Sequence, residues 1–179
     1  MKNFLKYTLI SIIVLIGAGY LYITLTPPAS PLETSTFNQD GKDISITYSK
    51  PYKKGRLIFG NESDGALVPY NQYWRTGANR HTIINTDSDL NFNNNILSSG
   101  EYSLYTVPGQ DSWEVVINSE NGFFGIYQPD PKNDLFSFET SSSSLDDSIE
   151  QLTIDFVTDS IGSSIRLRWD QTQVLMPFK

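Results

Sequence analysis

Between Tyr48 and Asn79, cationic and aromatic residues lie among glycines and prolines, a combination suited to binding an anion. Within this stretch, Arg75 lies between Trp74 and the turn-forming run Thr76-Gly77-Ala78-Asn79. An arginine beside an aromatic ring and a glycine-bearing turn can hold a carboxylate or a phosphate through two parallel hydrogen bonds. Alternatively, Arg75 stacks on Trp74 and caps the backbone carbonyls of a buried tight turn. The sequence leaves both interpretations open.

A second cationic group surrounds Gly55. Lys53, Lys54 and Arg56 would form an anion-binding loop if their side chains point the same way. The alternative is a solvated hairpin turn. The glycines of the chain match neither a P-loop nor a dinucleotide-binding fingerprint, so nucleotide binding has no sequence support.

Aromatic side chains accompany these cations. Tyr70, Tyr73, Trp74, Tyr102 and Tyr105 would suit a sugar-stacking surface, and packing in the core of a β domain explains them equally well. We therefore predict a non-catalytic binding or envelope-interaction module for a small anionic or glycan ligand. Its candidate ligand-binding residues are Tyr48, Lys54, Arg56, Tyr70, Trp74, Arg75, Asn79, His81 and Tyr102.

The chain has few residues suited to metal binding or catalysis. It has no cysteine and one histidine, His81, which excludes thiolate and multi-histidine metal sites. It also lacks the G-x-S-x-G nucleophile elbow of α/β hydrolases. We predict no catalytic residue, no metal and no cofactor. The alternatives are a hydrolase of envelope glycans or peptides that uses Arg75, His81 and a carboxylate such as Glu101, and a structural accessory domain.

Charge is unevenly distributed along the chain. Residues 42–80 carry seven Lys and Arg against three Asp and Glu, a net charge of +4. Residues 81–179 carry four against fifteen, a net charge of −11. A basic face on an acidic body favours a small anionic ligand over nucleic acid, because the rest of the domain would repel a polyanion. We therefore predict no nucleic-acid partner.

The N-terminal segment is apolar. Residues 7–25 carry no charge, and as a helix this run would be close to the ~30 Å thickness of a bilayer core. Lys2 and Lys6 precede it and no Lys or Arg follows until Lys42, which predicts an N-terminus in the cytoplasm and a domain in the periplasm or outside. A cleaved signal peptide is the alternative. We predict that residues 1–25 are kept as a transmembrane anchor or uncleaved signal, with residues 7–25 contacting the cytoplasmic membrane.

The remaining sequence divides into a spacer and a β-rich domain. Residues 26–42 are rich in Pro, Ser and Thr and are expected to form an extended linker. Residues 43–179 show period-two alternation between turn residues, typical of an all-β antiparallel β-sandwich or jelly roll. The expected strands cover residues 44–48, 56–59, 81–86, 101–107, 113–118, 123–127, 135–138, 151–157 and 164–169. The serine run at residues 141–144 is expected to be a loop, with one helical turn over residues 145–149.

A set of sequence blocks resembles a known family. YSKP, KGRLIFG, LVPY, WRTGAN, GEYSLYTVPG and WEVVIN, in this order, are similar to the bacterial family called domain of unknown function 2911. The resemblance covers residues 43–179 and implies an exported β-rich domain with no assigned activity. The chain departs from the family pattern at the insert Asn61–Ala66, at Arg80, where an acidic residue is common, and at His81, where a small residue is usual.

Overall fold

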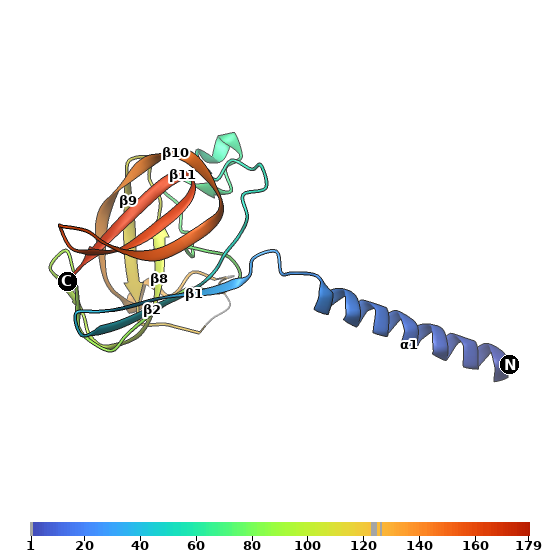
Figure 1. The fold of residues 1–179 in the computed structure, drawn as a ribbon. Coiled ribbons are helices and arrows are strands. Elements are labelled where there is room, and N and C mark those ends of the chain that lie inside the picture. Colours follow the sequence, from blue (N-terminus) through green and yellow to red (C-terminus); the bar gives the residue numbers. More distant parts are fainter. Residues whose placement is uncertain (1, 123–124, 126) are drawn as a thin grey trace.

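The computed structural model describes residues 2–122, 125 and 127–179, which form one helix followed by a β domain (Figure 1). The domain contains a continuous seven-stranded antiparallel sheet in the order β1-β2-β5-β8-β9-β10-β11. Its strands are β1 (Leu32–Gln39), β2 (Lys42–Ser49), β5 (Thr82–Thr86), β8 (Gly100–Val107), β9 (Ser112–Asn118), β10 (Asp134–Thr158) and β11 (Ser163–Phe178). Two small pairs accompany it, β3 (Phe59–Gly60) with β4 (Val68–Pro69), and β6 (Leu90–Phe92) with β7 (Asn95–Leu97).

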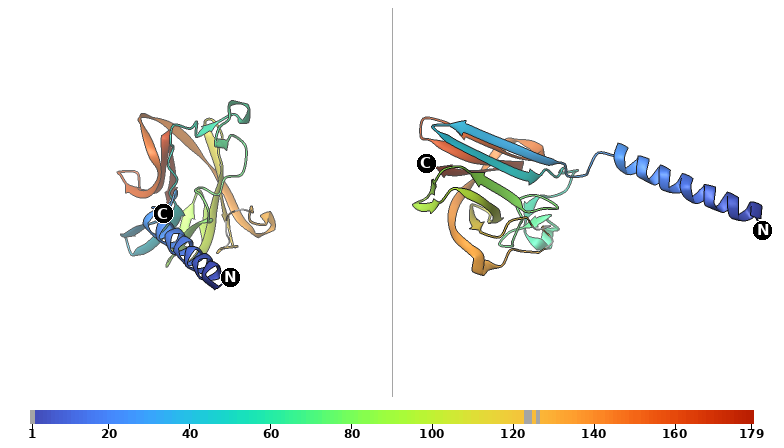
Figure 2. Two further views of the ribbon diagram at one scale, coloured as in Figure 1. Left: turned by 90° about the vertical axis from the view of Figure 1, so that its right-hand side faces the viewer. Right: turned by 90° about the horizontal axis from the view of Figure 1, so that it is seen from below.

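The sheet curls until its first strands meet its last ones. The Ser35 hydroxyl of β1 donates to the Ile154 carbonyl of β10 at 2.6 Å, and the Phe37 ring lies 5.5 Å from the Phe156 ring. Figure 2 shows β1 and β2 lying next to β10 and β11. The prediction of a β domain with an antiparallel main sheet is confirmed, although the small β3–β4 pair is parallel. The architecture is a single curled sheet rather than the two separate sheets of a sandwich.

The core fills the inside of this curl. Leu104 of β8 and Trp169 of β11 are 2% and 1% exposed, as their strict apolar alternation predicts. Ile165 and Leu167 lie on the same inner face of β11 and are fully buried. The turn that joins β8 to β9 lies between the strands expected over residues 101–107 and 113–118, and the turn that joins β10 to β11 lies between those expected over residues 151–157 and 164–169.

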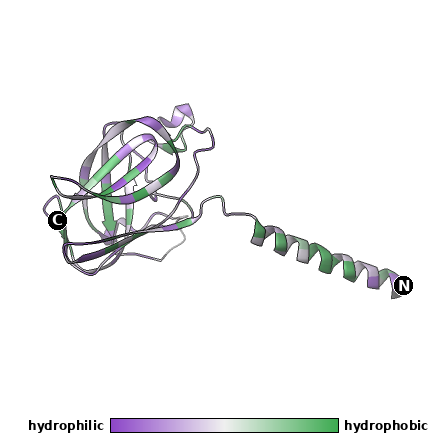
Figure 3. Cartoon of the chain, in the orientation of Figure 1, coloured by the Kyte–Doolittle hydropathy of each residue, from purple (hydrophilic) through white to green (hydrophobic). Residues whose placement is uncertain are grey.

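The helix α1 (Lys2–Leu25) extends away from the domain in Figure 1, and its described side chains are exposed. Apolar residues follow most of its length (Figure 3). Among the described residues, no helix has the length and apolarity needed to cross a membrane. The predicted transmembrane span is therefore not supported.

Three predictions of local structure are wrong. Residues 32–39 of the predicted linker form β1, which pairs with β2 along its whole length although only Phe37 is buried. The expected strand over residues 56–59 is reduced to Phe59–Gly60, because Lys54 and Gly55 have positive φ angles and Arg56 folds back on the turn. The serine loop and helical turn over residues 141–149 belong to β10, where Ser141 pairs with Ser112 of β9 and Ser142 pairs with Val174 of β11. The strand predicted over residues 123–127 lies largely outside the described residues.

Candidate functional site: a basic pocket

The segment from Trp74 to Asn79 is fixed to the sheet by backbone hydrogen bonds. The Trp74 N–H donates to the Thr106 carbonyl at 2.8 Å, and the Thr106 N–H donates back at 3.0 Å. The chain then turns sharply, with positive φ angles at Thr76 and Asn79. The Thr76 carbonyl accepts from the Thr82 hydroxyl at 2.8 Å. These bonds hold the segment in one conformation against β5 and β8.

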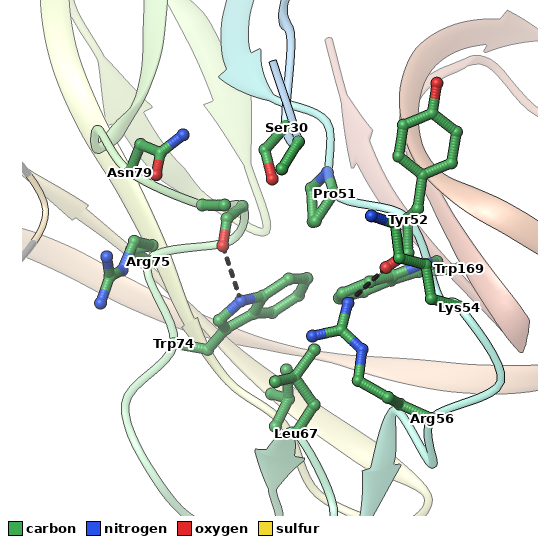
Figure 4. A pocket seen from close by; sticks show the side chains of 14 residues that line it. Ser30, Pro51, Tyr52, Lys54, Arg56, Leu67, Trp74, Arg75, Asn79 and Trp169 are labelled. Atoms are coloured by element: carbon green, nitrogen blue, oxygen red, sulfur yellow. Dashed lines mark hydrogen bonds between the residues drawn. The ribbon is translucent and has the colours of Figure 1, made fainter. Parts of the chain in front are cut away.

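Gly77 packs closely against its neighbours. A Cβ atom at this position would lie 3.0 Å from the Ser49 carbonyl oxygen and 3.3 Å from the Thr82 hydroxyl. The indole N–H of Trp74 donates to the Gly77 carbonyl at 3.1 Å, shown by a dashed line in Figure 4. The turn therefore brings the Trp74 ring and the backbone of residues 77–79 to one wall of a cavity.

The loop Lys53–Arg56 supplies a second wall. Arg56 donates through Nε to the Lys53 carbonyl at 2.9 Å and through Nη2 to the Tyr52 carbonyl at 2.5 Å. Lys53 is occupied elsewhere, since its ammonium lies 2.5 Å from the Asp170 carboxylate. The Lys54 N–H donates to the Glu150 carboxylate, whereas the Lys54 ammonium makes no hydrogen bond or ion pair within the described part of the chain. Three N–H donors of Arg56 also stay unused there.

These walls enclose a cavity of about 430 Å³, which we call the basic pocket (Figure 4). Its volume lies within the range of ligand sites. The lining residues are Ala29, Ser30, Pro51, Tyr52, Lys54, Arg56, Leu67, Val68, Trp74, Arg75, Gly77, Ala78, Asn79 and Trp169. Three of these residues are cationic and none is acidic.

The cations differ in how they face the basic pocket. In Figure 4, the Lys54 and Arg56 side chains point toward its centre, while the Arg75 guanidinium is turned away. Arg75 is half-buried and makes no hydrogen bond or ion pair with another described residue. Its charge acts instead on Tyr73: burial raises the pKa of the Tyr73 phenol, and the nearby Arg75 opposes that rise. Lys54 and Arg56 are therefore the groups placed to meet a ligand.

Two stacked indoles form the floor. The Trp74 and Trp169 rings have centroids 5.9 Å apart and planes inclined by 19°. The Trp74 N–H is satisfied by Gly77, but the Trp169 N–H has no hydrogen-bond partner among the described residues. A buried donor without a partner is costly, so the floor contains one group that an acceptor would stabilise.

Five of the nine predicted site residues line the basic pocket, namely Lys54, Arg56, Trp74, Arg75 and Asn79. The other four do not. Tyr48 is a core residue whose hydroxyl accepts from the Ile154 N–H at 2.9 Å. Tyr70 and Tyr102 are half-buried and pack against the core. His81 is buried, with Nε2 3.0 Å from the Tyr127 carbonyl oxygen.

The two interpretations of Arg75 are both modified by the structure. The carbonyls that Arg75 was expected to cap have other donors, because Gly77 accepts from the Trp74 indole and Asn79 accepts from the Gly125 N–H at 2.7 Å. A Cβ on Gly125 would lie 2.9 Å from Arg75 Cδ, so the side chain packs beneath this residue. The aliphatic part of the Arg75 side chain therefore borders the basic pocket, while its guanidinium points away from the pocket.

Sequence reasoning missed several lining residues, above all Ser30, Tyr52, Leu67 and Trp169. Trp169 lies in the apolar alternation of β11, and its contact with Trp74 crosses almost a hundred residues of sequence. No pattern in the sequence pairs these two positions. Within the described part of the chain, no group of three or more His, Cys, Asp and Glu residues is placed to hold a metal ion.

Comparison with known proteins gives one match. The family model described as "Protein of unknown function (DUF2911)" matches residues 30–178. The match begins before the expected linker ends and so includes β1 in the family domain. No curated protein and no solved structure matches the chain.

Proposed function

We propose that this chain, which belongs to the DUF2911 family, is a non-catalytic module that binds a small anionic ligand in the basic pocket. The observation that carries the proposal is the convergence of Lys54 and Arg56 on a cavity that has no acidic residue among its described lining residues. The chain as a whole has a net charge of −7, so the positive charge around the basic pocket is a local feature of the surface. Two unneutralised cations beside one cavity repel each other, and an anion between them relieves that repulsion.

The loop geometry supports the same conclusion. Arg56 is held by two backbone hydrogen bonds, so its guanidinium is positioned before a ligand arrives. Preorganisation reduces the entropy lost on binding. Lys54 adds a mobile ammonium that can adjust to a carboxylate or a phosphate.

A neutral glycan is supported less well than an anion. Sugar stacking needs an accessible aromatic face, and both indoles of the floor are more than nine-tenths buried. Tyr52, at 36% exposed, is the most accessible aromatic ring of the lining. A sugar could stack only on Tyr52, whereas an anion would make favourable electrostatic contacts with both inward-pointing cations, Lys54 and Arg56.

A hydrolase is not favoured at this position. Of the three residues considered for it, Arg75 borders the basic pocket, whereas His81 and Glu101 are not among its lining residues. A general base must reach the atom that it deprotonates, directly or through one water. A ligand in the basic pocket would therefore have no histidine–carboxylate pair beside it.

The test is thermal unfolding of the full chain at constant ionic strength with inorganic phosphate, acetate or glucose. At ten times its Kd, a ligand that binds only the folded state stabilises it by about 1.4 kcal/mol, which raises Tm by a few degrees. We expect a rise with phosphate or acetate and none with glucose. A rise with glucose alone would support the glycan alternative, and no rise with any probe would refute the proposal.

We also propose that the domain works outside the cytoplasmic membrane, with residues 7–25 in contact with lipid and the N-terminus in the cytoplasm. The supporting observations are the uncharged run over residues 7–25, Lys2 and Lys6 before it, and the exposed apolar side chains of α1. Cell fractionation and N-terminal sequencing test this. A mature chain that begins beyond Leu25, or one found in the soluble cytoplasmic fraction, would contradict it.

A further inference from the structure

We infer that the ligand of the basic pocket is an organic oxyanion with an apolar body, which packs on the pocket's apolar wall while its carboxylate or phosphate meets Lys54 and Arg56. This inference rests on the proposed function and specifies the class of ligand. An inorganic anion or a sugar phosphate would satisfy the cations but leave the apolar wall uncovered.

The first supporting observation is how exposure varies across the basic pocket. Lys54 and Arg56 are exposed, whereas Val68, Trp74 and Trp169 are buried. The cations thus lie at the mouth and the apolar side chains form the floor. A ligand with a charged end and an apolar end fits this arrangement in one orientation, with its charge toward the solvent.

The second observation is an exposed apolar wall beside the cations. Leu67 is 42% exposed and Tyr52 is 36% exposed, and both line the basic pocket together with Ala29 and Pro51. In Figure 4, Leu67 and Pro51 lie on opposite sides of the two indoles. Exposed apolar side chains that line a cavity, here Leu67 and Tyr52, are stabilised when an apolar group covers them.

The third observation is size. A cavity of about 430 Å³ is much larger than a phosphate or a carboxylate requires, since one water occupies about 30 Å³ of liquid. An anion bound by Lys54 and Arg56 alone would leave most of that space to solvent. A body of several carbon atoms would fill it.

The test uses the full chain and four probes: inorganic phosphate, acetate, butyrate and hexanoate. Binding is followed through the indole N–H signals of Trp74 and Trp169 in NMR spectra, because these report on the basic pocket and not on α1. The backbone N–H signals of β6 (Leu90–Phe92), which does not line the basic pocket, are the internal reference. A partly buried methylene improves affinity about twofold to fourfold, so we expect hexanoate to bind at least tenfold tighter than acetate.

The wall is tested with Leu67→Ser. In this variant hexanoate should bind less than threefold tighter than acetate. Its phosphate affinity should stay within twofold of the parent. Leu57→Ser is the matched control, because Leu57 has nearly the same exposure, 45%, and does not line the basic pocket. The Leu57→Ser variant should retain the full chain-length effect, that is, the whole increase in affinity from acetate to hexanoate. Both positions are exposed, so neither change removes a core residue.

The outcomes separate the inference from the proposed function. If phosphate and acetate bind but hexanoate binds no tighter than acetate, the inference is wrong and the anion site stands. If Leu67→Ser keeps the full chain-length effect, the apolar body binds elsewhere and the inference is again wrong. If no probe shifts the indole signals, both the inference and the proposed function are wrong.

Discussion

The indole rings of Trp74 and Trp169 stack with centroids 5.9 Å apart, joining the turn after β4 to the last strand of the sheet. Trp74 belongs to the segment that carries one wall of the basic pocket, and Trp169 belongs to the core alternation of β11. The shape of the basic pocket therefore depends on a contact between segments far apart in sequence.

A double-mutant cycle tests that dependence. We expect Trp74→Phe and Trp169→Phe each to lower the free energy of unfolding, and the two changes to be coupled by about 0.5–1.5 kcal/mol, because either one removes the indole stack. Urea unfolding of the parent, both single variants and the double variant measures the coupling. Strict additivity would mean that the two rings do not stabilise each other.

The inner face of β8 is tested by Leu104→Ala. Leu104 is 2% exposed, so its truncation should cost about 2–5 kcal/mol through lost burial and a residual cavity. Leu135→Ala is the control, because Leu135 is 49% exposed and should cost much less. If Leu104→Ala lowers the free energy of unfolding in urea by less than ~1 kcal/mol, the Leu104 side chain does not face the core.

Alkaline pH should destabilise the domain through buried tyrosines. Burial raises the pKa of Tyr48 and Tyr105, and for Tyr105 the hydrogen bond to Asp134 raises it further. The unfolded chain loses these protons near pH 10 and the folded chain keeps them, so the free energy of unfolding falls as pH rises above ~10. Each tyrosine contributes about 1.4 kcal/mol per pH unit while it stays protonated in the folded state.

Tyr105→Phe isolates one of these groups. Asp134 keeps its hydrogen bond from the Asn118 amide at 2.7 Å, so the variant should still fold. Its free energy of unfolding, measured in urea at pH 9, 10 and 11, should fall less steeply than that of the parent. Equal slopes for parent and variant would show that the Tyr105 phenol ionises normally in the folded domain.

The predictable parts of the fold are strands whose side chains alternate or are rich in β-branched and aromatic residues. In β11 buried residues alternate with more exposed ones, so a period-two pattern locates this strand, whereas β8 and β9 are buried on both faces over residues 103–106 and 115–118 and are located by their β-branched and aromatic residues between turns. β1 and the serine run of β10 have little such pattern, and backbone pairing with neighbouring strands holds them. Hydrogen bonds of this kind do not depend on side-chain type, so the sequence carries little trace of them.

The candidate site divides in the same way. Lys54, Arg56, Trp74, Arg75 and Asn79 come from two local segments whose composition marks them. Trp169 joins them only because the curled sheet brings distant segments together, whereas Leu67 lies between the two local segments in the sequence. Tyr48 carries the same aromatic signal as the true lining residues, yet lies in the core, because composition does not indicate which face of a strand a side chain occupies.

The variant Arg75→Lys tests whether Arg75 caps backbone carbonyls or only borders the basic pocket. Since its guanidinium makes no hydrogen bond or ion pair with the described residues, Arg75→Lys should change the free energy of unfolding by less than ~1 kcal/mol. Its positive charge is kept, so phosphate affinity should stay within twofold of the parent. A loss of about 2–4 kcal/mol in urea unfolding would instead indicate a network of several hydrogen bonds that depends on the planar guanidinium.

The most direct test of the account is calorimetric titration of inorganic phosphate into Lys54→Gln. Lys54 is exposed, and its only hydrogen bond in the described chain is made by its backbone N–H, so the change removes charge without removing a fold contact. Lys132→Gln is the control, since Lys132 is also exposed and does not line the basic pocket. We predict that phosphate affinity falls about fivefold or more in Lys54→Gln, a loss of roughly 1 kcal/mol or more of binding free energy. In Lys132→Gln it should change less than twofold. A folded Lys54→Gln variant that binds phosphate as tightly as the parent would contradict the account.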